Sequence, residues 1–95
     1  MVGIDKEGYL KNQADWTEEV AARIANREGI DNLTEKHWQI IYYIRDYYND
    51  FNTVPPLHKI SEKSGLNALE ISRLFPKENI RSAYRVAGLP RLERF

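Results

Sequence analysis

The feature that most restricts how this chain can fold is a wide apolar stripe between Thr34 and Asn49. Thr34 is a favourable N-cap residue, so we expect a helix to start there and to run to about Asn49. The apolar residues of this segment recur at helical spacing: Trp38, Ile41, Ile44, Tyr48 and Phe51, with Ile40, Tyr43 and Tyr47 beside them. A helix that is apolar over so much of its surface is covered by other elements. We therefore expect a central helix with shorter helices packed around it.

Cap and stop signals divide the rest of the chain into four shorter helices. Asp15 or Thr17 can begin the first of them, and glycines or prolines separate the others. The expected segments run from about 15 to 28, 56 to 64, 67 to 75 and 78 to 87. The third and fourth helices, with a turn at Gly65 between them, match a helix-turn-helix element. The shared stripes predict this core: Trp16, Ile24, Trp38, Ile41, Ile44, Ile60, Leu74 and Ile80.

The start of the chain predicts a β-hairpin over residues 2–11. Two short apolar stretches, Val2–Ile4 and Tyr9–Leu10, flank a four-residue polar link that ends in Gly8. The expected fold class is therefore mainly α, a small helical bundle with a helix-turn-helix element and an N-terminal β-hairpin. With 95 residues, we expect a single domain over 1–90 and an exposed C-terminal arm over 91–95.

Composition excludes several kinds of chemistry. The chain has no cysteine, so it forms no disulfide, holds no zinc-thiolate site and carries no sulfur on a thiol of its own. The apolar runs are too short for a membrane span, and the first residues do not resemble a signal peptide. These features predict a cytoplasmic protein that does not contact membranes.

No catalytic or metal-binding pattern stands out. His37 and His58 lack the spacing of a ligand pair, and we expect both to be structural or surface residues. No serine has the setting of a nucleophile elbow, and no Gly-rich loop could hold a phosphate. We therefore expect no cofactor, no metal and no enzymatic activity.

Charge is unevenly distributed along the neutral chain. Residues 1–70 hold eight Lys/Arg and twelve Asp/Glu, whereas residues 71–95 hold six Lys/Arg and two Glu. This asymmetry favours a basic docking surface for an acidic protein partner. The candidate partner-binding residues are Arg81, Arg85, Arg91, Arg94 and Phe95. The alternative, that these arginines are solvated or pair with the acidic body, stays open.

The helix-turn-helix pattern raises DNA binding as a second hypothesis. A recognition helix needs a basic, polar face, but this segment offers Asn67, Glu70, Ser72 and Arg73. Glu70 would face phosphates unfavourably, and the domain as a whole is neutral. We therefore regard DNA as a disfavoured partner, and a corner used for packing as the simpler interpretation.

Several segments together resemble the DsrC/TusE/DsvC family of sulfur-relay proteins. The resembling segments are Asp5–Leu10 with Trp16, His37–Trp38, Ile44–Tyr48, Phe51–Thr53 with Pro55, Arg73–Lys77 and Ala87–Pro90. They follow one another in family order over almost the whole chain. The resemblance implies a small helical fold with an N-terminal hairpin and a helix-turn-helix. It also implies a partner from a sulfurtransferase or dissimilatory sulfite reductase system.

The chain departs from this family at the two cysteine positions. The family carries a cysteine next to the chain end on a mobile arm, and some members have a second one upstream. In this chain those positions fall at Arg94 and Tyr84. Because the thiolate is the nucleophile in persulfide chemistry, arginine cannot replace it. The resemblance therefore predicts a non-catalytic binding or regulatory protein. The alternatives are a DNA-binding regulator and a sulfur carrier whose end is altered in this chain.

Overall fold

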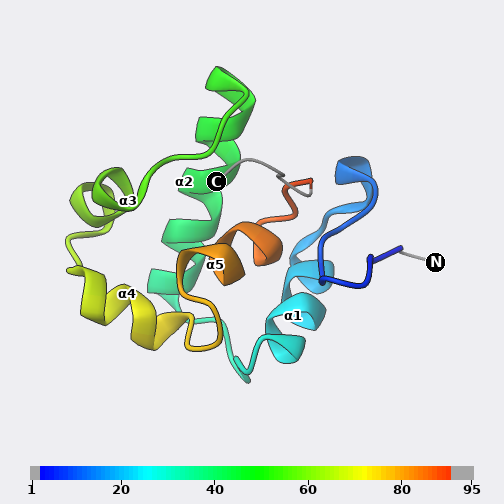
Figure 1. The fold of residues 1–95 in the computed structure, drawn as a ribbon, viewed down its shortest axis with the longest axis horizontal. Coiled ribbons are helices and arrows are strands. Elements are labelled where there is room, and N and C mark those ends of the chain that lie inside the picture. Colours follow the sequence, from blue (N-terminus) through cyan, green and yellow to red (C-terminus); the bar gives the residue numbers. More distant parts are fainter. Residues whose placement is uncertain (1–2, 91–95) are drawn as a thin grey trace.

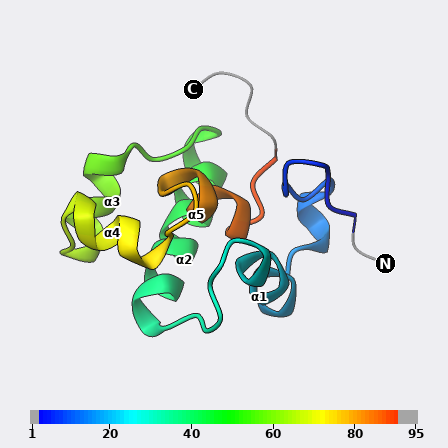
Figure 2. The ribbon, with the colours of Figure 1, turned by 60° about the horizontal axis from the view of Figure 1, so that its bottom comes forward.

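The wide apolar stripe forms the longest helix of the computed structural model, which describes residues 3–90. The elements, in chain order, are η1 (Gln13–Asp15), α1 (Glu18–Arg27), α2 (Glu35–Phe51), α3 (Leu57–Ser64), α4 (Ala68–Leu74) and α5 (Ile80–Val86). Helix α5 lies across α2, with α1 on one side and the α3–α4 pair on the other (Figure 1, Figure 2). The expectation of a mainly α fold with five helices is thus confirmed.

The hydrophobic core lies where α2 meets the other helices. Four of the eight expected core residues, Ile24, Ile41, Ile44 and Ile60, are almost completely buried. The other four are half-buried against that core: Trp16, Trp38, Leu74 and Ile80. Helix α5 and the turn after it contribute more than expected, because Ala83, Tyr84, Val86, Ala87 and Leu89 are all buried. This helix and turn therefore lie at the centre of the fold rather than at its margin.

The start of α2 is held by a histidine. Nδ1 of His37 accepts a hydrogen bond from the backbone N–H of Thr34 at 3.0 Å, so the ring proton is on Nε2. Nε2 then donates to the carbonyl of Leu74 at 2.8 Å, which ties α2 to the end of α4. His37 is only 5% exposed. Of the two roles expected for the histidines, His37 takes the structural one, whereas His58 lies on the surface.

The predicted N-terminal hairpin is wrong for the residues that the structure describes. A single antiparallel bridge joins Ile4 and Leu10, and no strands form around it. The carboxylate of Asp5 accepts the backbone N–H groups of Glu7 at 2.9 Å and Tyr9 at 3.0 Å. A side chain that bonds nearby backbone donors competes with a strand ladder. The segment therefore closes as a tight turn around Asp5.

The expected corner between the third and fourth helices is present. A three-residue turn, Gly65 to Asn67, joins α3 to α4. Gly65 has a φ of 74°, a left-handed conformation that glycine adopts most readily. Asn67 and Glu70 form a reciprocal capping box at the start of α4. None of the helices in the described part of the chain is long and apolar enough to span a membrane.

Candidate functional site

The turn after α5 is held by two side chains from distant parts of the chain. The indole N–H of Trp16 donates to the carbonyl of Val86 at 2.9 Å. Nη1 of Arg45 donates to the carbonyl of Ala87 at 2.7 Å. The guanidinium carbon of Arg45 lies 3.9 Å from the centre of the Trp16 ring, within the range of a cation–π contact. Trp16 and Arg45 together fix where residues 86 to 89 run. We call these two residues the Trp–Arg clamp.

Gly88 is required by the clamp for steric reasons. A Cβ atom built on Gly88 would lie 2.3 Å from Cδ1 of Trp16, closer than any side chain tolerates. Gly88 also has a φ of 77°, which L-residues with side chains rarely adopt. The Gly88-Leu89-Pro90 sequence therefore marks a close approach between the start and the end of the described chain.

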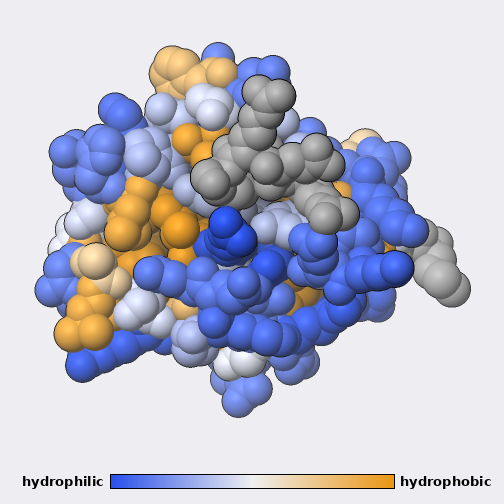
Figure 3. Space-filling view, in the orientation of Figure 1, coloured by the Kyte–Doolittle hydropathy of each residue, from blue (hydrophilic) through white to orange (hydrophobic). Residues whose placement is uncertain are grey.

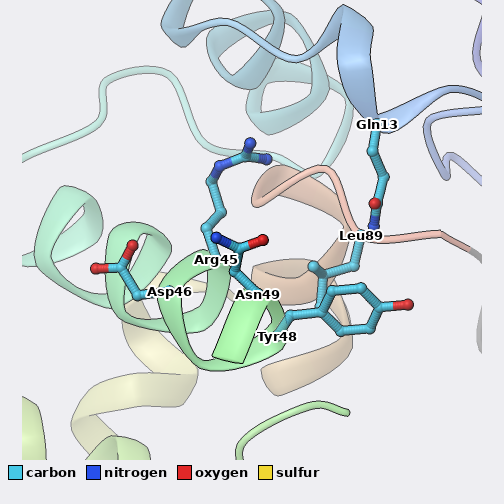
Figure 4. Close-up of a pocket in the computed structure, with 6 residues that line it drawn as sticks. All are labelled: Gln13, Arg45, Asp46, Tyr48, Asn49 and Leu89. Carbon is cyan, nitrogen blue, oxygen red and sulfur yellow. The ribbon is translucent and has the colours of Figure 1, made fainter. Parts of the chain in front are cut away.

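A surface pocket of about 170 Å³ lies beside this turn (Figure 4). Its lining residues come from η1, from the second half of α2 and from the turn after α5: Gln13, Arg45, Asp46, Tyr48, Asn49 and Leu89. Gln13 reaches from η1 toward Leu89, and Asn49 extends from α2 toward the same space. Asp46 points the other way. This pocket could not be predicted from the sequence, because its residues are dispersed along the chain.

Tyr84, where the resemblance predicts the upstream cysteine position, is buried in the core. It is 3% exposed, and its hydroxyl donates to the carbonyl of Pro55 at 2.8 Å. Burial, with a smaller contribution from Tyr9, raises the pKa of Tyr84 to about 12. The phenol therefore stays protonated and remains a donor at neutral pH. Position 84 is a structural contact between α5 and the turn that precedes α3.

Arg85 does not lie on an open basic surface, contrary to the expectation from its spacing with Arg81. It is 6% exposed, and its Nη1 pairs with Glu28 at 3.1 Å and with Glu78 at 2.5 Å. Its guanidinium carbon lies 5.0 Å from the centre of the Tyr9 ring. Arg85 joins α5 to the end of α1 and to the N-terminal turn. It therefore corresponds to the alternative of pairing with the acidic body.

The other candidate docking residues remain predictions. Arg81 is exposed on α5. Arg91, Arg94 and Phe95 lie outside the described residues, so the structure does not place the expected arm. Arg81 is thus the one candidate that residues 3–90 place on the surface.

The outer surface around α3 and α4 carries apolar side chains. Figure 3 shows them gathered on the side of the molecule where these two helices lie, whereas the surface over α1 is mostly hydrophilic. Leu69, on α4, is 59% exposed. A DNA-reading helix would present basic and polar side chains there. Within residues 3–90, no group of three His, Asp or Glu side chains could hold a metal ion.

Comparisons with known proteins agree with the fold and with the resembling segments. The family model described as "DsrC like protein" matches residues 1–94. The chain belongs to the DsrC/TusE family. Sulfurtransferase TusE of Yersinia pseudotuberculosis is 39% identical over 99 residues, which cover 96% of this chain and 90% of that relative. Sulfurtransferase TusE of Escherichia coli K12 is 40% identical over 95 residues, which cover 92% of this chain and 85% of the relative.

Solved structures show the same DsrC/TusE fold. The crystal structure of dissimilatory sulfite reductase I (DsrI) has a TM-score of 0.91 and 30% identity, and the match covers 99% of this chain and 90% of that one. The oxidized gamma-subunit of the dissimilatory sulfite reductase (DsrC) from Archaeoglobus fulgidus has a TM-score of 0.86 and 31% identity, covering 99% and 91%. This DsrC/TusE chain thus shares a sulfur-relay fold, yet its sequence contains no cysteine.

Proposed function

We propose that this DsrC/TusE chain is a non-catalytic binding or regulatory partner of a sulfurtransferase or dissimilatory sulfite reductase. The observation that supports this proposal is the absence of any cysteine from a chain that otherwise matches the family. Sulfur transfer through a persulfide requires a thiolate on the carrier. Without a thiol the chain can occupy a docking site on a sulfur-relay protein, but it cannot receive or pass on sulfur.

The buried Tyr84 supports this proposal. Tyr84 fills the core and hydrogen-bonds Pro55. Position 84 therefore has a structural role in this chain, as expected of a family member that uses no cysteine there.

The proposed docking surface is basic and belongs to the C-terminal region. Its candidates are Arg81, exposed on α5, and the sequence residues Arg91, Arg94 and Phe95. Arg85 is not a candidate because it is buried. An acidic groove on the partner would be attracted to these cations, and Phe95 would supply an apolar anchor.

The first prediction concerns sulfur uptake. The purified chain should gain no mass when it is incubated with a persulfide-loaded sulfurtransferase, because it has no thiol to accept the sulfur. Intact-protein mass spectrometry measures this directly, and a cysteine-bearing TusE relative serves as the positive control. A gain of one sulfur atom that a reductant removes would refute the non-catalytic role.

The second prediction concerns docking. We expect two variants to reduce capture of sulfurtransferase or sulfite reductase subunits from native extract at least fivefold. Deletion of residues 91–95 removes cations that an acidic groove would attract, and Arg81→Glu reverses one such charge. Quantitative mass spectrometry of the captured proteins measures the effect. Arg23→Glu is the matched control, since Arg23 is an exposed arginine on α1 and is not among the docking candidates. Capture that is unchanged in both variants would place docking elsewhere.

A further inference from the structure

We propose that the pocket beside Leu89 is a recognition site for a carboxylate side chain, Asp or Glu, of the partner protein. The inference rests on the proposed function for the claim that the occupant is a protein, and it adds the chemistry of one contact. The pocket volume is about 170 Å³. An apolar protein cavity of about 150 Å³ holds a benzene molecule, so this space suffices for one carboxylate side chain.

Arg45 supplies the charge for this recognition. Its guanidinium has five N–H donors. Only one hydrogen bond from it occurs within residues 3–90, from Nη1 to the carbonyl of Ala87. Stacking on Trp16 covers one face of the guanidinium and restricts its rotation. The remaining edge is thus held in place at the pocket wall. A guanidinium fixed in this way loses little entropy when it binds a carboxylate.

Two side-chain amides complete the polar wall. Gln13 and Asn49 extend from opposite sides into the space that Leu89 borders (Figure 4). Each amide has two N–H donors and one carbonyl oxygen. The Asn49 oxygen faces the pocket in Figure 4, so its amide has to rotate to donate to a carboxylate. Leu89 and the Tyr48 ring provide apolar contact for the methylene groups of the incoming side chain.

Asp46 is the one acidic residue in the lining, and its orientation decides which charge the pocket prefers. Its side chain points away from Gln13 and Asn49 in Figure 4. No ion pair joins it to Arg45 in the described structure, so the charge of Arg45 is not neutralised by direct contact. Asp46 acts on the pocket only through space and weakens the binding of an anion. The negative end of the α2 dipole lies in the last turn, which includes Tyr48 and Asn49, so it also opposes an anion and Arg45 has to outweigh it.

The test is a titration of the full chain with the peptide acetyl-Gly-Glu-Gly-amide, followed by two-dimensional amide NMR. Acetyl-Gly-Gln-Gly-amide, which is nearly identical in shape but neutral, is the comparison probe. We expect saturable shifts at Gln13, Arg45, Asn49 and Leu89 with the Glu peptide, at a Kd of about 1–10 mM. We expect the Gln peptide to bind at least fivefold more weakly.

Variants that change one charge test whether the pocket prefers a negatively charged ligand. Asp46→Asn should lower the Kd of the Glu peptide about threefold, because it removes a repulsive charge. Asp50→Asn is its matched control, since Asp50 lies one turn further along α2 and does not line the pocket. Asn49→Asp should raise the Kd at least tenfold, whereas the exposed Asn26→Asp on α1 should leave it unchanged.

Arg45→Gln should abolish the shifts. Arg45 also donates a hydrogen bond to the carbonyl of Ala87, so this variant can lose its fold. In that case the Asn49→Asp variant decides whether the pocket recognises a carboxylate. Equal binding of the two peptides, weaker binding after Asp46→Asn, or shifts that map elsewhere would each overturn the inference. The two proposals fail separately. Glu-peptide binding without partner capture through the C-terminal region would refute the proposed function, and with it the protein occupant, but not the pocket's preference for a carboxylate. Partner capture without Glu-peptide binding would refute only the pocket.

Discussion

Replacement of Arg85 by alanine is expected to lower the free energy of unfolding by about 3–5 kcal/mol, the cost of removing one member of a buried ion pair. The carboxylate of Glu28 is 6% exposed and would keep only its hydrogen bond from Ser82, at 2.6 Å. The contact between Arg85 and the Tyr9 ring would also be lost. Urea unfolding followed by circular dichroism measures the change.

The matched control for this prediction is Arg81→Ala. Arg81 lies on the same helix and carries the same charge but is exposed, so its replacement should change the unfolding free energy by less than about 0.5 kcal/mol. If the two variants are equally stable, the buried cluster contributes nothing and Arg85 regains its place among the docking residues. The pair of variants therefore separates a structural arginine from a docking arginine on one helix.

Tyr84→Cys, which restores the residue that some family members have there, is expected to destabilise the fold by about 2–4 kcal/mol. The change removes a ring that is 3% exposed and leaves a cavity in the core. It also leaves the carbonyl of Pro55 without the Tyr84 hydroxyl. For a domain of this size the midpoint of thermal unfolding should fall by roughly 10–20 °C, measured by calorimetry.

Tyr84→Phe separates the loss of the ring from the loss of the hydroxyl group. It keeps the ring and removes only the hydroxyl, so we expect a loss of about 1–2 kcal/mol from the unpaired carbonyl. A Tyr84→Cys variant as stable as the parent would mean that position 84 remains adapted to a small residue. That result would contradict the structural role of Tyr84.

The local elements of the fold could be predicted because their signals lie close together in the sequence. The stripe through Ile41 and Ile44 located the central helix, and Thr34 marked its start. The N-terminal hairpin was wrong because the pattern of apolar residues does not reveal that the Asp5 side chain bonds the amides of Glu7 and Tyr9. Cross-chain backbone pairing around this turn is short, from Asp5 N–H to the Tyr9 carbonyl and from Lys11 N–H to the Gly3 carbonyl.

The site was predicted less well, because its contacts join distant residues. Arg81 and Arg85 share a helix-like spacing, but only Arg85 meets Glu28, 57 residues earlier in the chain. No feature of the sequence near Arg85 indicates that Glu28 is its partner. The Trp–Arg clamp is similar, since Trp16 was expected as a core residue and Arg45 appeared only within a family-like segment. A single sequence cannot show which of several charged residues finds a buried partner.

The clamp has a consequence for how the chain reaches its folded state. The Trp16–Val86 hydrogen bond spans 70 residues, and α1 packs directly on α5. Such a contact closes a long loop, and this closure lowers the conformational entropy of the chain before the contact gives any stabilisation. We therefore expect the faces of α1 and α2 that pack on α5 to stay uncovered during synthesis until α5 and the turn after it have been made.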